Sequence, residues 1–219
     1  KAEGLGGNAL IIFTSENGCA PYAEVTNVEA RGHFASGPFR GYKADIFEGG
    51  HRVPFIVKWA NEISAGSVSD ETICLTDFMH TAASVLGVDL PETVAEDSYD
   101  LSKIWNGELP EGTSLREVTI HHSVNGTFAI RWGDWKLILS PDSGGWSEPR
   151  PERMKGKTGV QLYNLVTDSG EKTNVAEQNP EIVNGLKKAL RSNIEAGRST
   201  AGAKQAYVNP DNWAILERL

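Results

Sequence analysis

Two short apolar runs near the start of the chain have the pattern of strands in an α/β sheet. Residues 9–13 (ALIIF) are continuously apolar and lead into a polar segment, TSENG. Residues 53–59 form a second run, with Pro54 at its start, where a strand tolerates a missing N–H. Uninterrupted runs of this length are typical of strands buried on both faces. The pattern predicts two such strands, with a ligand-binding loop after the first, as in open α/β sheets.

A long loop and a helix are predicted around the second strand. Residues 19–48 show no sustained periodicity, and irregular loops longer than about 12–15 residues are usually functional or disordered. Residues 76–86 have helical periodicity, with Thr76 as the expected N-cap and Gly87 beyond the end. We expect one apolar face of this helix to pack on the sheet. That face consists of Phe78, Ala82, Val85 and Leu86.

A segment rich in proline, glycine and acidic residues, 91–112, separates this part from one of different character. We place a domain boundary near Thr113, so that residues 1–113 belong to an α/β core and residues 114–219 form a small α+β unit. Strand-like runs in the second unit are separated by turn signals such as Asn125-Gly126, which predicts an antiparallel sheet. The runs are residues 117–121, 127–131, 135–139 and 160–163.

The final predicted helix opens at Asn179-Pro180 and ends before Gly197. Proline is favoured at the first helical position, and glycine just beyond the last. The apolar stripe of this helix should pack on the antiparallel sheet. It consists of Val183, Leu186, Leu190 and Ile194. The expected fold class is therefore α/β: a sheet-and-helix core followed by a small antiparallel sheet with a C-terminal helix.

Composition narrows the classes of function. The chain has 21 basic and 29 acidic residues and a net charge of −8, which argues against nucleic acid as a partner. No run approaches the roughly 18 apolar residues of a membrane span, and residues 1–8 lack a signal-peptide pattern, so a soluble chain without a membrane partner is expected. Cys19 and Cys74 match no zinc motif. Asn125-Gly126-Thr127 matches a glycosylation sequon, but we favour a tight turn there.

Three sets of segments carry a resemblance to a known enzyme family. They are IIFTSENG (11–18), FRGYKADIFEGGHRVP (39–54), and the softer set RWGDWKLI (131–138), QLYNL (161–165) and DSGEKTN (168–174). They resemble the family's TSDNG loop, its R-G-x-K-x-x-x-x-E-G-G-x-R-V-P block, and its W-K-L, L-Y-D-L and D-P-x-E-x-x-N elements, in the same order. The chain is thus similar to the C-terminal part of a type I sulfatase, an arylsulfatase-like member of the alkaline-phosphatase-like superfamily.

The resemblance implies a calcium-dependent hydrolase of sulfate esters. A sulfate monoester is held as an anion while its leaving oxygen gains charge, so fixed cations supply most of the stabilisation. Calcium takes carboxylate and amide oxygens, and Glu16 and Asn17 match family metal-ligand positions. Glu16 replaces the usual Asp, which moves the carboxylate by about 1.5 Å, one bond length. Calcium's flexible shell absorbs such a shift more easily than magnesium's; without the resemblance, an ordinary turn is the simpler interpretation.

Lys43 matches the family lysine that contacts the sulfate, and it is the expected catalytic cation and substrate contact. His121 and His122 end a predicted strand, so their side chains should point to opposite faces. The expected roles are catalytic for His121, as proton donor to the leaving group or as substrate contact, and substrate-binding for His122 and His51. A purely structural role for these histidines stays equally open. Arg52 matches a family position and is expected to be mainly structural.

The family's nucleophile is a formylglycine made from the cysteine of a C-x-P-x-R signature. Residues 19–23 read CAPYA, which lacks the arginine and follows the TSENG loop, so we reject Cys19 as nucleophile. The implied partners are the missing N-terminal half, which carries the formylglycine, and a sulfated carbohydrate or aryl sulfate. The chain alone is expected to be inactive and to self-associate through its first two strands. The family is typically periplasmic, secreted or lysosomal.

Two other functions stay open from the sequence. One is a phosphonate or phosphodiester hydrolase of the same superfamily, which uses a similar arrangement of metal and nucleophile. The other is a non-catalytic module that binds anionic polysaccharide. The block at residues 39–54 with its Lys43 favours an enzyme, whereas the missing first half favours the module.

Overall fold

The computed structural model describes residues 4, 7–60 and 62–206, so the expectation for residues 1–8 falls largely outside the described residues. Its elements follow the predicted order of an α/β part and then a small antiparallel sheet with a final helix. They are β1 (Leu10–Thr14), α1 (Val25–Glu29), α2 (Glu48–His51), β2 (Phe55–Trp59), α3 (Phe78–Val85), α4 (Ser102–Trp105), β3 (Val118–His122), β4 (Phe128–Trp132), β5 (Trp135–Ile138), β6 (Gln161–Asn164) and α5 (Pro180–Ala196).

The antiparallel sheet expected after Thr113 is confirmed. Its strands pair in the order β3-β4-β5-β6, each antiparallel to the next. The β3–β4 connection is the predicted turn. In it, the Gly126 N–H donates to the Ser123 carbonyl at 3.0 Å, a normal distance for this bond. Gly126 adopts φ 78°, a conformation that glycine enters without a steric penalty. The tight turn predicted at Asn125-Gly126 is therefore confirmed.

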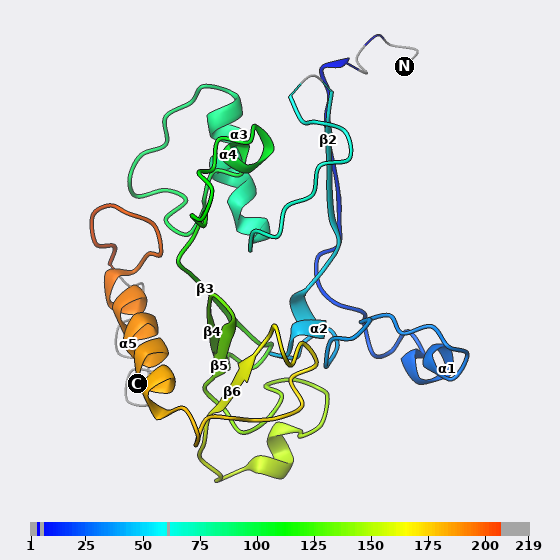
Figure 1. Cartoon of the computed structure of the whole chain (residues 1–219). Coiled ribbons are helices and arrows are strands. Elements are labelled where there is room, and N and C mark those ends of the chain that lie inside the picture. The colour runs from blue at the N-terminus through cyan, green and yellow to red at the C-terminus, as the bar shows by residue number, and fades with distance from the viewer. Residues whose placement is uncertain (1–3, 5–6, 61, 207–219) are drawn as a thin grey trace.

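The two faces of this sheet pack against different parts of the chain. On one face, Ile130, Leu137 and Leu162 form a core with α5, as its apolar stripe predicted. On the other face, Ala129, Ile138 and Tyr163 pack against Ile46 and Phe47 from the segment just before α2. Figure 1 shows α5 and α2 on opposite sides of the sheet. The segment that carries the 39–54 block is therefore one of the sheet's two covering layers. The boundary near Thr113 stays a prediction.

The first two strands form a separate antiparallel ribbon, in which β1 pairs with β2 and Phe13 lies opposite Ile56. Figure 1 shows this ribbon extending away from the small sheet. One face of it is exposed, with exposed fractions of 54% for Ile11, 63% for Phe13 and 61% for Ile56. The prediction that these strands are buried on both faces is therefore wrong for the described chain. Apolar side chains on both faces need a layer on each side, and no described segment covers the Ile11 face.

The α3 helix is also packed differently from the prediction. The expected contact of its apolar face with the first sheet is wrong, because Phe78 and Leu86 are exposed. Polar contacts hold the helix instead: buried Asp77 accepts hydrogen bonds from the backbone N–H groups of Cys74 and Tyr99. Asp77, rather than Thr76, therefore satisfies the start of this helical segment. Among the described residues, no helix is long and apolar enough to cross a membrane.

We predict that Leu190→Ala lowers the free energy of unfolding by about 2–5 kcal/mol, the usual cost of emptying a buried leucine site. Leu190 is fully buried between α5 and the sheet, so its loss leaves a cavity in the shared core. Urea denaturation followed by circular dichroism measures the change. The exposed Lys188→Ala on the same helix is the matched control. A decrease in the free energy of unfolding of less than about 1 kcal/mol for Leu190→Ala would contradict the packing of α5 on the sheet.

Candidate functional site

The loop after β1 lies directly against the segment around α2. The Gly18 N–H donates to the Gly50 carbonyl at 2.9 Å, and the Lys43 N–H donates to the Cys19 carbonyl at 2.9 Å. The approach is so close that a Cβ on Gly18 would stand 1.8 Å from the Gly49 carbonyl oxygen. Only glycine fits there. The structure thus places Gly18 and Cys19, the two residues after Glu16 and Asn17, beside the α2 segment and the backbone of Lys43.

Lys43 is presented from a tightly held turn. The next residue, Ala44, has φ 84°, a conformation that costs a non-glycine residue energy and persists only where its surroundings enforce it. The Asp45 carboxylate enforces it by accepting hydrogen bonds from the N–H groups of Tyr42, Trp146 and Ser147, at 2.8, 2.7 and 2.9 Å. Within the described part of the chain, the Lys43 ammonium takes part in no ion pair. A cation held in this way is suited to an external anion.

The end of β3 joins the same turn. The Val124 N–H, two residues beyond β3, donates to the Ala44 carbonyl at 3.1 Å. His121 and His122 at the end of β3 point to opposite faces, as predicted: His121 packs on His51 with ring centroids 3.9 Å apart, while His122 is exposed beside Phe128. Of the predicted site residues, Lys43, His51 and His121 therefore come from segments in direct contact.

A buried cluster of charges lies beneath this surface. The Lys136 ammonium is fully buried and lies 2.9 Å from Glu48 Oε1 and 2.9 Å from Glu171 Oε1. It also donates to the Ile46 carbonyl at 2.8 Å. Burial by itself raises the pKa of Glu48, but the charge of Lys136 and the contact with His51 together hold it well below its usual range. Glu48 is therefore an ion inside the protein.

The two inward histidines are neutral at pH 7. Burial, and then the positive charge of Lys136, lowers the pKa of His51. Burial, His51 and Lys136 lower the pKa of His121 well below its usual value, against the opposing effects of Glu48 and of a hydrogen bond to the Ile46 backbone. His51 Nε2 lies 3.2 Å from Glu48 Oε1. Because that carboxylate is ionised, it favours a proton on His51 Nε2.

The candidate calcium ligands have suitable chemistry but are few. Glu16 is exposed and Asn17 is half-buried, and each supplies one oxygen-bearing side chain of the kind that calcium prefers. Calcium takes about 6–8 oxygens, so two side chains make only part of a shell. In the ranges 7–60 and 62–206, no group of three or more His, Cys, Asp or Glu side chains could hold a metal ion. The donor set fits calcium in kind and is incomplete in number.

Sequence reasoning missed the residues that support the site from below. Lys136 and Glu171 were identified only as parts of family-like elements, and Asp45 was not singled out at all. One signal for Lys136 was present: it interrupts the apolar run at residues 135–139, on the same strand face as Ile138. A lysine at an inward strand position needs a carboxylate partner. Nothing local indicated which carboxylates those are, because they lie 88 and 35 residues away along the chain.

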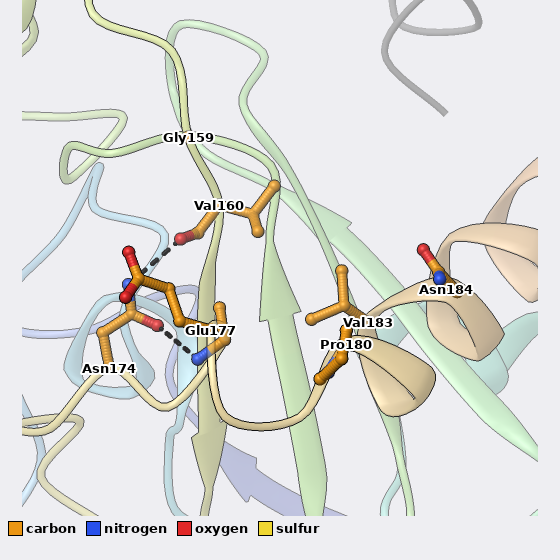
Figure 2. A pocket seen from close by; sticks show the side chains of 8 residues that line it. Gly159, Val160, Asn174, Glu177, Pro180, Val183 and Asn184 are labelled. Atoms are coloured by element: carbon orange, nitrogen blue, oxygen red, sulfur yellow. Dashed lines mark hydrogen bonds between the residues drawn. The ribbon is translucent and has the colours of Figure 1, made fainter.

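A shallow cavity of about 290 Å³ lies elsewhere, between β6 and the start of α5. Figure 2 shows Asn174 and Val160 on one side of it and Pro180 and Val183 on the other. The Asn174 side chain is already satisfied, because it donates to the Val160 carbonyl at 3.0 Å and accepts from the Leu162 N–H at 3.0 Å. The Asn174 amide is therefore not free to bind a ligand in this cavity.

The lowered histidine pKa values predict a loss of stability in mild acid. In the unfolded chain these histidines bind protons near their ordinary pKa of about 6.5, whereas in the folded chain their pKa values are lower and they bind protons only at a lower pH. Their contribution is complete above that pH and is lost as the pH falls below it. The free energy of unfolding should therefore fall between pH 7 and pH 5. Urea denaturation should show a weaker fall in His121→Phe and an unchanged fall in the exposed control His33→Phe; an equal fall in all three chains would contradict the assignment.

Known proteins with similar sequences belong to the family that the sequence motifs resemble. The sulfatase family model matches residues 1–88. An N-acetylgalactosamine-6-O-sulfatase of Bacteroides thetaiotaomicron is 32% identical over 188 residues, which cover 84% of this chain and 36% of that protein. Human arylsulfatase A is 30% identical, with coverage of 88% and 39%.

Solved structures give the same result. A sulfatase from a study of glycosaminoglycan metabolism by Bacteroides thetaiotaomicron superposes with a TM-score of 0.71 at 32% identity, covering 86% of this chain and 39% of that one. The PsFucS1 sulfatase from Pseudoalteromonas superposes with a TM-score of 0.65 at 28% identity, covering 84% and 36%. The chain thus spans well under half the length of the relatives it matches. It belongs to the sulfatase family of the alkaline-phosphatase-like superfamily and corresponds to a C-terminal part of its members.

Proposed function

We propose that this chain forms one wall of a sulfate-ester hydrolase site, with Lys43 as the cation that contacts the sulfate. The observation that carries the proposal is the position of Lys43. Its backbone is bonded to the loop that bears Glu16 and Asn17, and its ammonium has no ion-pair partner among the described residues. A candidate metal-binding loop bonded to the backbone of a lysine without an ion-pair partner suits a transferring sulfate group, because negative charge grows on its oxygens in the transition state.

Each residue then has a defined task. The Lys43 ammonium neutralises charge on the sulfate oxygens, and the strained turn around Ala44 limits how far it moves. Glu16 and Asn17 would hold a calcium ion through side-chain oxygens, and that ion would add a second fixed positive charge. The pairing Glu16-Asn17, rather than Asp-Asn, favours calcium over magnesium, whose shell is smaller and less flexible.

The lowered pKa values of His51 and His121 do not suit proton donation at neutral pH. His121 carries no ionisable proton to give at neutral pH, since burial and the Lys136 charge keep its pKa low. A general acid works best with a pKa near the working pH. We therefore propose His51 and His121 as a neutral, packed part of the wall. The substrate contact expected for His122 has no such support, because His122 lies beside Phe128 on the opposite face of β3 from His51 and His121.

The complete site needs residues from outside this chain. The chain contains no C-x-P-x-R signature, so we propose that a formylglycine nucleophile and the remaining calcium ligands come from the rest of a sulfatase. The exposed Ile11, Phe13 and Ile56 face of the β1–β2 ribbon supports such a partner, because a strand apolar on both faces expects a covering layer. Self-association of the isolated chain through the same face stays a prediction.

The proposed substrate class is sulfated sugars. This follows from the relative named N-acetylgalactosamine-6-O-sulfatase, which is 32% identical to this chain. An aryl sulfate is the convenient assay substrate for the same chemistry. Hydrolysis of phosphodiesters or phosphonates, the alternative within the superfamily, would appear as a preference for bis(aryl) phosphate over aryl sulfate in the complete protein. Polysaccharide binding without turnover in that protein would instead favour a non-catalytic module.

We predict that the purified 219-residue chain does not hydrolyse a fluorogenic aryl sulfate and binds calcium only weakly. Two candidate ligands are present, against the roughly 6–8 oxygens that calcium prefers, and the sequence has no C-x-P-x-R signature for a covalent nucleophile. Fluorescence assays with added calcium and isothermal titration measure the two properties. Turnover above background that disappears in Lys43→Ala would contradict the prediction, and Cys19, whose carbonyl accepts from the Lys43 N–H, would become the candidate nucleophile.

In the complete protein, we predict that Lys43→Ala lowers kcat/KM for a sulfate ester by about 10²–10³-fold, as removal of one charge-stabilising donor does elsewhere. The exposed Lys188→Ala on α5 is the control and should keep its activity. Steady-state kinetics measure both variants. A Lys43→Ala protein with wild-type kcat/KM would exclude Lys43 from the site.

A further inference from the structure

The segment that carries Lys43 is bonded at both ends to one residue, Glu171. At the first end, Arg40 Nη1 donates to the Glu171 carbonyl oxygen at 2.9 Å. At the second end, the Glu48 N–H donates to Glu171 Oε2 at 2.6 Å. Residues 40–48 therefore form an arch. Its two ends, Arg40 and Glu48, are both hydrogen-bonded to Glu171, and Lys43 lies between them.

Glu171 is itself rigidly placed. It is fully buried, and its remaining carboxylate oxygen, Oε1, lies 2.9 Å from the Lys136 ammonium. Its backbone has φ 50°, which a non-glycine residue keeps only where its surroundings fix it. The turn that fixes it is closed by Asp168, whose carbonyl accepts from the Glu171 N–H at 3.1 Å. The Asp168 carboxylate also accepts from the N–H groups of Lys172 and Thr173, both at 2.9 Å.

Arg40 is held in a similar way. Its guanidinium stacks on the Phe47 ring, with Cζ 3.8 Å from the ring centroid, and its Nη2 donates to the Glu148 carbonyl at 3.2 Å. Phe47 is the neighbour of Glu48 and is fully buried. The stacking therefore connects the Arg40 end of the arch with the Glu48 end, in addition to the hydrogen bonds that both ends make to Glu171.

We propose that Glu171 and Arg40 are positioning residues that set where the Lys43 ammonium stands in the active site. The proposal rests on the proposed function, in which Lys43 contacts the sulfate. Neither residue touches the substrate; both act through the shape of the arch. A lysine side chain is long and flexible, so its charge is useful only if its backbone is fixed. A displacement of about 1 Å at a reacting centre can cost about 10²-fold in rate.

A double-mutant cycle in the complete protein tests the proposal. Glu171→Gln keeps the size of the side chain, but an amide offers one acceptor oxygen where the carboxylate serves both the Glu48 N–H and Lys136. We expect Glu171→Gln to lower kcat/KM for a sulfate ester by about 10–100-fold when Lys43 is present. In the Lys43→Ala background the same change should cost less than about 2-fold, because the residue acts through Lys43.

Arg40→Met applies the same test at the Arg40 end of the arch and leaves the carboxylates of Glu48 and Glu171 and the Lys136 ammonium unchanged. It should show the same dependence on Lys43, so the proposal remains testable if Glu171→Gln fails to fold. The exposed Glu177→Gln is the matched control and should keep its activity in both backgrounds. Equal losses from Glu171→Gln or Arg40→Met with and without Lys43 would show a general structural role and overturn the proposal.

Amide hydrogen exchange in the 219-residue chain separates this proposal from the proposed function. The Lys43 N–H donates to the Cys19 carbonyl, so its exchange rate reports the order of the arch. Arg40→Met should speed that exchange at least about 10-fold and leave α5 amides unchanged. Unchanged exchange at Lys43 would overturn the positioning role, even if Lys43 proved essential. Faster exchange, with no effect of Lys43→Ala on activity, would instead overturn only the proposed function.

Discussion

The rest of the structure depends on the ion pairs that the buried ammonium of Lys136 makes. The ammonium meets the carboxylates of Glu48 and Glu171, each at 2.9 Å. These three residues come from three of the family-like segments, which lie far apart in the sequence: the E-G-G block, the W-K-L strand and the D-x-x-E turn. Taking such charges out of water costs several kcal/mol per ion, so the cluster persists only because every partner is present. It fixes the 39–54 block against the small sheet.

The arrangement of the candidate site follows from that attachment. With α2 fixed on the sheet, the Gly50 carbonyl receives the Gly18 N–H, and the loop bearing Glu16 and Asn17 is carried to Lys43. The same cluster keeps Glu48 ionised and the neighbouring His51 neutral. The chain therefore brings the backbone of Lys43 beside the loop that bears the two candidate ligands, Glu16 and Asn17, although it has no C-x-P-x-R signature and these two side chains make only part of a calcium shell.

Local patterns predicted the parts of the fold that local rules decide. The strands β3 to β6 and helix α5 follow from alternation, turn residues and the Val183, Leu186 and Leu190 stripe, because each pattern is satisfied within a few residues or by one neighbour. Burial of β1 and packing of α3 were predicted wrongly. Their apolar residues call for covering layers, and a pattern cannot show whether the layer lies within the same chain. The partners of Lys136 escaped prediction because an ion pair between distant residues leaves no periodic trace.

The most direct test of this account is the free energy of unfolding of Lys136→Met, measured by urea denaturation of the 219-residue chain. Methionine keeps the volume but leaves two buried carboxylates, on Glu48 and Glu171, without their cation. We predict a loss of about 3–5 kcal/mol, the usual cost of removing one partner from a buried pair. The triple variant Lys136→Met, Glu48→Gln, Glu171→Gln should recover part of this loss. A cost for Lys136→Met below about 1 kcal/mol, typical of exposed ion pairs, would contradict this prediction.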